Sequence, residues 1–187
     1  MPKYEVAERH RAHVRAPADV TYEAAATLDL QRSRIIHGLF KTREFILGGQ
    51  QSQPVLPKPL FSWAKALGWG LLAQIPGREV VMGAVTKPWE PNVVFRPLRP
   101  DEFADFDEPG YVKIVWTLRS DPISAIESMA RTDTRVITTD PGARARFRLY
   151  WAFLSPGILL IRRVALAMVK EEAERVASRT PPTPSPI

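Results

Sequence analysis

The sequence predicts an α+β protein in which a curved antiparallel sheet of about six strands wraps around a long C-terminal helix. In residues 140–179, apolar side chains recur at spacings of three and four, which is typical of a helix with a broad buried stripe. Residues 70–138 instead alternate between apolar and polar side chains, with short Pro- and Gly-containing turns between the runs. Consecutive strands joined by short turns pair in the antiparallel sense.

Composition limits the class of protein. The 187 residues fit one domain, expected over 1–179, with a Pro-rich tail at 180–187 expected to be disordered. The net charge of +6 is scattered, without the basic stripe that nucleic acid binding requires. The absence of cysteine excludes disulfides, thiol catalysis and thiolate metal sites. The first residues contain no apolar signal region, so a cytoplasmic protein is expected.

The N-terminal part is predicted to form one strand and two helices. Residues 4–15 alternate strictly, which indicates a half-buried strand. Pro17 and Asp19 favour a helix that continues to about residue 28. A second helix is expected at about 30–47, where two glycines end it. Both helices are expected to close one edge of the sheet.

The middle of the chain is predicted to supply the other strands. Residues 48–59 are expected to form a flexible or extended loop, and a short helical segment follows. On the strand at 111–119, Trp116 shares a face with apolar neighbours and is assigned to the core or to a cavity wall. The five strands expected here are 71–75, 79–87, 93–96, 111–119 and 125–138.

The last helix has recognisable start and kink signals. Asp140 is a good N-cap residue, and Pro141 suits the first helical position. Pro156 removes a backbone donor, so a kink is expected there. The apolar run 149–161 holds only 13 residues, whereas a membrane span needs about 20. No stable membrane span is therefore expected, although association with a membrane surface stays possible.

Two polar pairs are candidates for chemistry. Glu8 and His10 share the inward face of the first strand, roughly 7 Å apart, and could perform acid–base catalysis or form a structural pair. Asp133 and Arg135 share one face of the last strand. They would form a buried pair if that face looks inward, and a surface pair if Thr132 and its even-numbered neighbours do.

No cofactor and no metal site are predicted. The three histidines do not form a chelating set, and His10 and His13 lie on opposite faces of one strand. The sequence contains neither a glycine-rich phosphate loop nor a nucleophile elbow.

Aromatic, methionine and aliphatic side chains form a candidate ligand pocket between sheet and helix. Such a lining suits a pliable apolar pocket, and it suits an ordinary core equally well. The candidate lining residues are Ile36, Phe40, Trp69, Met82, Ile114, Trp116, Leu118, Met129, Tyr150 and Leu154.

Several strings resemble one superfamily. They are PGREVVMGAVTKPW with Glu79 and Gly83, TDTRV at 132–136, RFRLYW at 146–151, and SPGILLIRR. Together with the element order, they resemble the helix-grip fold of the START-like superfamily, also called SRPBCC, and an uncharacterised bacterial branch of it. Asp133 stands where that branch is expected to have glutamate, which keeps the charge. The superfamily includes polyketide cyclases, dehydrases and lipid-transfer domains, so the resemblance implies a fold more than an activity.

Three functions remain open at this point. The first is binding or carriage of a hydrophobic small molecule, such as a lipid, polyketide or isoprenoid, between the sheet and the last helix. The second is a cyclase- or dehydrase-type enzyme that uses Glu8, His10, Asp133 and Arg135. The third is a peripheral membrane or interaction protein, which would use the last helix or residues 48–69. The oligomeric state is not indicated.

Overall fold

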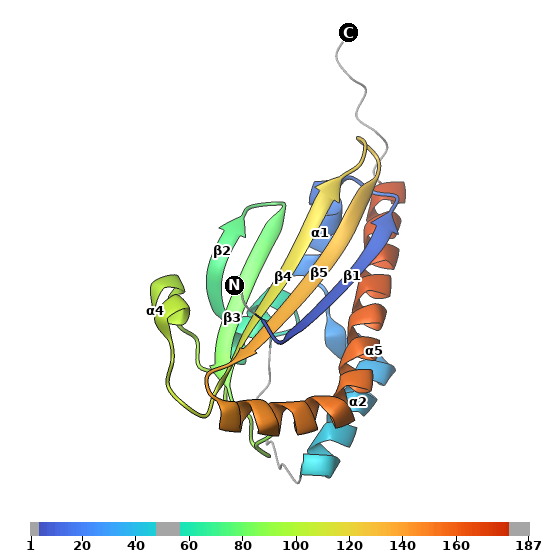
Figure 1. Ribbon diagram of the computed structural model, residues 1–187. Helices are drawn as coiled ribbons and strands as arrows, with labels where there is room; N and C mark the ends of the chain where they lie inside the picture. Colours follow the sequence, from blue (N-terminus) through green and yellow to red (C-terminus); the bar gives the residue numbers. More distant parts are fainter. Residues whose placement is uncertain (1–3, 48–56, 180–187) are drawn as a thin grey trace.

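The structure is a computed structural model that describes the backbone of residues 4–47 and 57–179, and the side chains within these ranges except at 31, 40 and 42–47. Figure 1 shows one sheet with helices packed mainly on one of its faces. The elements in chain order are β1 (Val6–Val14), α1 (Ala18–Ala26), a 3-10 turn (Leu30–Arg32), α2 (Arg34–Leu47), α3 (Leu60–Ala66), β2 (Gly70–Ile75), β3 (Glu79–Thr86), α4 (Pro100–Asp105), β4 (Val112–Pro122), β5 (Ser128–Thr138) and α5 (Pro141–Arg179).

The sheet has five strands within the described residues, in the order β1-β5-β4-β3-β2, and all neighbours are antiparallel. The predicted strand at 93–96 is wrong, because this segment forms only an isolated bridge between Arg96 and Val85. Pro91 and Pro97 flank the segment, and proline cannot donate to a strand ladder. The class of fold is nevertheless the predicted one, an antiparallel sheet with a long C-terminal helix.

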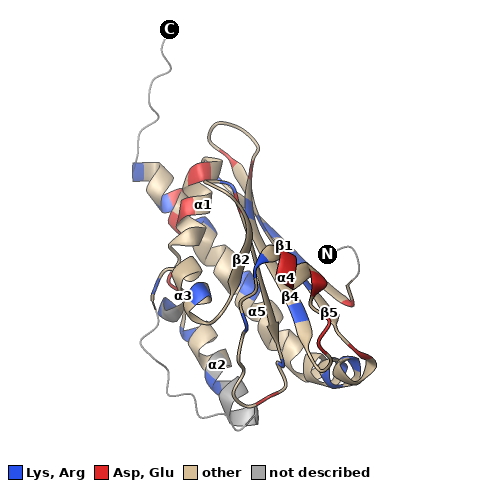
Figure 2. Ribbon diagram, turned by 90° about the vertical axis from the view of Figure 1, so that its left-hand side faces the viewer, with Lys and Arg blue, Asp and Glu red and all other residues tan. Residues whose placement is uncertain are grey.

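Helix α5 is bent into two arms, one crossing the end of the sheet and the other running beside it (Figure 1). Its start agrees with the prediction, since Asp140 Oδ1 accepts hydrogen bonds from the backbone nitrogens of Gly142 (2.7 Å) and Ala143 (3.0 Å). Pro156 lies inside the helix and removes one of its backbone donors, which explains a bend. Figure 2 shows α1, α2 and α3 together on one side of the sheet.

We call the sheet face that packs against α1 and α5 the inner face, and the opposite one the outer face. Alternation along β5 assigns the faces: Thr132 and Thr134 are buried, whereas Arg131 between its neighbours is exposed. The register then places Glu8, His10 and Trp116 on the inner face with these threonines. The core is built from inner-face side chains packed against the helices, with Val80, Met82, Leu118, Ala25, Leu60 and Val169 in its largest cluster.

Two local elements differ from the expectations. The second helix starts at Arg34, after the 3-10 turn, and the hydroxyl of Ser33 accepts a hydrogen bond from the nitrogen of Ile36 at 3.3 Å. Helix α4 was not expected, although its start has a clear signal: Pro100 at the first helical position, and Glu102 accepting from the nitrogen of Arg99 at 3.0 Å. Most of the predicted loop at 48–59 falls on residues 48–56, outside the described residues.

Candidate functional site

The candidate site is a polar cluster between β1, β5 and α5. Glu8 and His10 both project from the inner face of β1, where they lie opposite Thr134 and Thr132. His10 Nε2 is 3.9 Å from Glu8 Oε2, and the two side chains are only 14% and 27% exposed. This distance exceeds that of a hydrogen bond, so the pair is close without being bonded.

Arg162 from α5 completes the cluster. Burial lowers the pKa of its guanidinium to about 10, and the nearby carboxylates of Glu8 and Asp133 partly offset this effect. Its Nε atom has no hydrogen-bond partner within the described part of the chain. Arg163, the next residue, is exposed, because neighbouring positions of a helix point in different directions.

The electrostatics of the cluster favour a neutral imidazole. Burial lowers the pKa of His10, the charges of Arg162 and Arg163 lower it further, and Glu8 opposes them. His10 Nε2 and Thr134 Oγ1 are buried and, like Arg162 Nε, have no partner among the described residues. Buried polar atoms are usually hydrogen-bonded, and leaving one unpaired costs about 1–3 kcal/mol. Arg162 acts electrostatically on His10, and Thr134 lies opposite Glu8 on the same face of the sheet, so these unpaired atoms indicate a place that a polar ligand atom would satisfy.

An apolar wall lies directly beside these polar atoms. Trp116 pairs across the sheet with Thr134 on one side and Met82 on the other. Its indole nitrogen donates a hydrogen bond to Thr132 Oγ1 at 2.9 Å. The ring of Phe61 from α3 contacts the indole edge-on, with 6.3 Å between the ring centroids. The inner face thus changes from polar at β1 to apolar at β3 and β4.

The predicted pocket residues divide into several groups. Ile36, Met82 and Leu118 are buried in the core, and Trp69 and Trp116 are partly buried beside the cluster that holds Met82. Ile114 and Tyr150 pack instead in a second cluster, around Phe147. Leu154 is half-buried on α5. The side chain of Phe40 lies outside the described residues.

Three predicted site residues lie on the wrong face for an inner pocket. Met129 is on the outer face of β5, where it pairs with His13 and Asp121. Asp133 and Arg135 are also on the outer face, and they form an ion pair there at 3.4 Å. They project away from Glu8 and His10, so the four polar candidates do not converge in one cavity. The reason is the unbroken pairing of β1 with β5, which fixes the alternation along the whole strand.

Sequence reasoning missed Arg162, although a signal was available. Arg162 and Arg163 stand between Ile158 and Leu166, within an apolar helix. Adjacent helical positions point about 100° apart, so this pair is a signal that one arginine lies nearer the apolar face than the other. Among the residues that the structure describes, no group of three His, Asp or Glu side chains could hold a metal ion.

The first arm of α5 carries an exposed apolar stripe. Leu149 and Phe153 on this arm are 63% and 75% exposed, and Leu160, which follows Pro156, is 43% exposed. By length and composition α5 could cross a membrane, since an 18-residue window reaches a mean hydropathy of 1.7 and only 11% of that window is buried. Long core helices of soluble proteins can pass the same test, and α5 also packs against β1 and α1.

Comparison with known proteins gives matches only among solved structures, all at low sequence identity. No protein family matches the sequence, and no curated protein matches it. Among solved structures, the di-domain aromatase/cyclase BexL from the BE-7585A biosynthetic pathway matches 92% of this chain with 15% identity and a TM-score of 0.35. This chain covers 47% of that protein.

Two further structures match most of both chains. Protein CV1439 from Chromobacterium violaceum is 13% identical over 88% of this chain and 96% of its own, with a TM-score of 0.37. Norcoclaurine synthase from Thalictrum flavum is 11% identical over 95% and 89%, with a TM-score of 0.34. The helix-grip arrangement predicted from the sequence is confirmed by the described fold itself, in which β1 pairs with β5 and α5 packs on β1.

Proposed function

We propose that the protein binds a small, mainly apolar molecule that carries an oxygen-bearing polar end, between the inner face of the sheet and α5. The observation that supports this proposal is the set of buried, unpaired atoms Arg162 Nε, His10 Nε2 and Thr134 Oγ1. A guanidinium donates hydrogen bonds only, so its partner in the ligand is an acceptor oxygen. A carboxylate is the best match, because it also neutralises the buried charge.

The apolar part of the ligand would contact the wall beside these atoms. Trp116 and Met82 lie next to Thr134 in the same cross-strand row, and Phe61 borders the indole. Aromatic and methionine side chains adapt to apolar ligands of varied shape. A polar end held at β1 and an apolar body lying toward β3 fit the gradient along this row.

Binding of such a molecule can be tested in two steps, the second of which compares variants of the adjacent residues Arg162 and Arg163. Native mass spectrometry of the freshly purified protein, followed by organic extraction, shows whether a molecule is retained and identifies its class. Titration with a series of aromatic and long-chain carboxylic acids then measures affinity by quenching of tryptophan fluorescence. Arg162→Met should weaken binding at least tenfold, whereas Arg163→Met, its exposed neighbour, should leave affinity unchanged. Equal affinities for both variants and the parent protein would refute the proposal.

An enzymatic role is the alternative at the same site. A neutral His10 with an unpaired Nε2 beside Glu8 is a suitable proton acceptor, as a cyclase- or dehydrase-type reaction requires. Proton abstraction would appear by NMR as loss of a ligand proton to deuterium in D₂O. His10→Gln should abolish this exchange while the molecule still binds. Exchange that continues in this variant would exclude His10 as the base.

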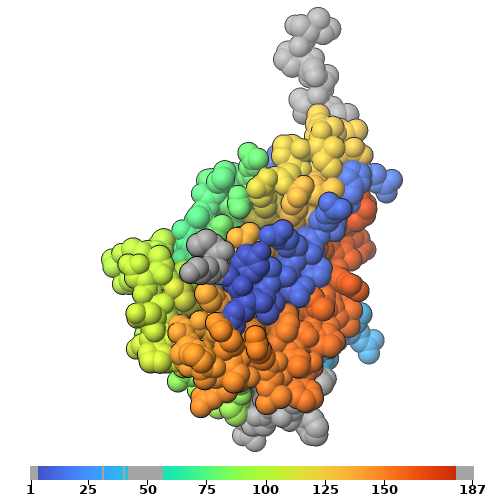
Figure 3. All heavy atoms as spheres, viewed as in Figure 1, coloured from blue at the N-terminus to red at the C-terminus, as the bar shows by residue number. Residues whose placement is uncertain are grey.

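Attachment to an anionic membrane surface is a second candidate function, favoured by the stripe on the first arm of α5. Leu149 and Phe153 lie one turn apart on this arm, and the arginines Arg146 and Arg148 are exposed beside them. Basic helices with an apolar face lie in the membrane interface in this way. Figure 3 shows the same arm, in orange, along one edge of the molecular surface.

Vesicle flotation tests this attachment. The protein should float with vesicles that contain phosphatidylglycerol, and much less with pure phosphatidylcholine. The double variant Leu149→Glu/Phe153→Glu should stay in solution. Ile126→Glu changes a side chain of similar exposure, 67%, in the turn between β4 and β5, and should float like the parent. Equal flotation of all three proteins would exclude the arm as the attachment site.

A further inference from the structure

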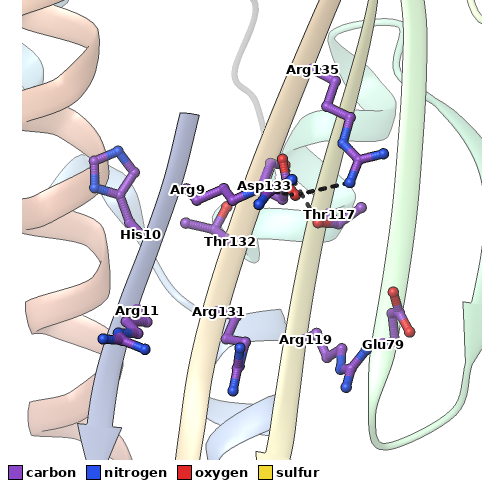
Figure 4. Close-up of a pocket in the computed structure, with 10 residues that line it drawn as sticks. All are labelled: Arg9, His10, Arg11, Glu79, Thr117, Arg119, Arg131, Thr132, Asp133 and Arg135. Atoms are coloured by element: carbon purple, nitrogen blue, oxygen red, sulfur yellow. Dashed lines mark hydrogen bonds and ion pairs between the residues drawn. The ribbon is translucent and has the colours of Figure 1, made fainter. Parts of the chain in front are cut away.

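The outer face of the sheet contains a groove of about 540 Å³, which the inner-face residues His10 and Thr132 also border. Figure 4 shows its lining from β1, β3, β4 and β5, and shows that His10 points the other way, toward the helix. The lining residues are Arg9, His10, Arg11, Glu79, Thr117, Arg119, Arg131, Thr132, Asp133 and Arg135. We propose that this groove binds a small molecule that carries two or more phosphate groups.

A row of three arginines crosses the groove. Arg11 pairs directly with Arg131, and Arg131 pairs directly with Arg119 on the next strand. Like charges placed directly opposite each other destabilise a sheet. Neighbouring strands lie about 4.8 Å apart, so the row spans about 10 Å. Such an unfavourable row is understandable if an anion with several charges lies along it.

The carboxylates near this row are too few for each guanidinium group to have its own partner. Asp121 forms ion pairs with Arg119 at 2.5 Å, with Arg131 at 2.9 Å and with Arg78 at 3.9 Å. Among the described residues Arg11 forms no ion pair, and its side chain is exposed. Asp121 therefore serves three guanidinium groups, Glu79 lies opposite one of them, Arg119, on β3, and Arg11 has no carboxylate partner among the described residues.

Two further arginines lie around Asp133, next to the first row. Arg9 and Arg135 contact the same oxygen of Asp133, at 3.3 and 3.4 Å (Figure 4). The other oxygen, Asp133 Oδ1, is buried without a partner in the described part of the chain. Thr117, which also lines the groove, pairs with Asp133 across the strands, and its hydroxyl donates a hydrogen bond to the backbone oxygen of Asp133 at 3.4 Å. The groove thus presents five guanidinium groups, with Asp133 and Glu79 as its only lining carboxylates among the described residues.

Phosphate is the chemistry that this arrangement fits best. A guanidinium presents a planar fork of donors that matches two oxygens of one phosphate. Several forks along about 10 Å suit linked phosphates better than a single one. Because the inner cluster lies on the opposite face, this proposal does not depend on the proposed apolar ligand.

Calorimetric titration of the full chain at 150 mM salt tests the inference with inorganic tripolyphosphate, orthophosphate and citrate as probes. Tripolyphosphate should bind at least tenfold more tightly than orthophosphate and citrate. The variant Arg11→Gln/Arg131→Gln should lose at least tenfold of that affinity. Arg148→Gln removes an exposed arginine of α5 and should change nothing. Thermal unfolding without a probe should show the double variant at least as stable as the parent, because it relieves repulsion in the row.

Several results would overturn the proposal. Tripolyphosphate that binds no better than orthophosphate would exclude recognition of linked phosphates. Citrate that binds equally tightly would show that negative charge alone is recognised. An equal loss in Arg148→Gln would show attraction to the net charge rather than to the groove. Tighter binding of a single-stranded oligonucleotide that competes with tripolyphosphate would replace the small molecule with a nucleic acid.

Discussion

The indole of Trp116 is bonded to Thr132, which is not its direct partner across the sheet. In the ladder between β4 and β5, Trp116 lies opposite Thr134, yet its Nε1 donates to Thr132 Oγ1 at 2.9 Å. The hydroxyl of Thr132 is therefore paired, while that of Thr134 is buried without a partner among the described residues. The diagonal bond fixes the orientation of the ring and leaves the unpaired hydroxyl beside it.

Removing this bond should lower stability. In Trp116→Phe the hydroxyl of Thr132 loses its donor, and we expect the free energy of unfolding to fall by about 1–2 kcal/mol. Urea denaturation measures the change. The double variant Trp116→Phe/Thr132→Val should recover part of the loss, because no unpaired polar atom remains. A single variant as stable as the parent would show that the bond contributes nothing.

Replacing the buried guanidinium should stabilise the protein while weakening the proposed ligand binding. Arg162→Met keeps the length of the side chain and removes a charge that burial disfavours. We expect the ligand-free variant to gain on the order of 1 kcal/mol in free energy of unfolding. Chemical denaturation of Arg162→Met and Arg163→Met provides the comparison, since Arg163 is exposed. A marked loss of stability in the first variant would mean that the guanidinium is structurally required.

The stability of the protein should depend on His10 at mildly acidic pH. The folded state lowers the pKa of His10 below its ordinary value of 6.5, so the unfolded chain binds more protons in that range. The contribution of His10 is thus fully present above about pH 6.5, and it is lost as the pH falls from there through the lowered pKa of the folded state. Thermal unfolding between pH 7.5 and 5 should show a smaller loss of stability in His10→Gln. His13→Gln, on the outer face of the same strand, is the control, and an identical change in both variants would contradict the assignment.

Two glycines should respond in opposite ways to alanine. A Cβ atom at Gly83 would overlap Leu72 Cδ1 and lie 3.1 Å from Phe103 Cε2, whereas one at Gly38 would meet nothing within 4 Å. Gly83→Ala should cost about 1–3 kcal/mol of stability. Gly38→Ala, in helix α2, should gain about 0.5–1 kcal/mol from helix propensity. Urea denaturation of both variants measures the direction of each change. A Gly83→Ala variant as stable as the parent would mean that Phe103 and its helix α4 move aside at little cost.

The sequence was sufficient for the inner faces of β1 and β4 but not for that of β5. Apolar residues alternate along β4, so the inward position of Trp116 follows from the pattern. Along β5, threonines alternate with charged residues, and both classes are polar. Hydrophobicity therefore could not decide which set is buried, and the decision came from the register with β1. Met129 was misassigned for the same reason, since its own apolar character outweighed the parity of its strand.

Only the β1 part of the candidate site could be predicted from the sequence. Glu8 and His10 followed from local alternation, which needs only the strand itself. Arg162 is more than 150 positions from His10 in the sequence, and the bend and position of α5 bring the two side chains near each other. No local pattern contains that information. The arginine row has the same origin, because three strands have to align before its charges face each other.

The bend in α5 has a consequence for how the chain can change in length. A straight helix of 39 residues would measure about 58 Å, whereas an 11-residue strand such as β5 spans about 37 Å. By turning a corner inside one continuous helix, the chain forms two walls without a connecting loop. Insertions are usually accommodated in loops, and an extra residue inside either arm would rotate every following side chain by about 100°. The corner therefore ties the position of Arg162 to the number of residues between Asp140 and Arg162.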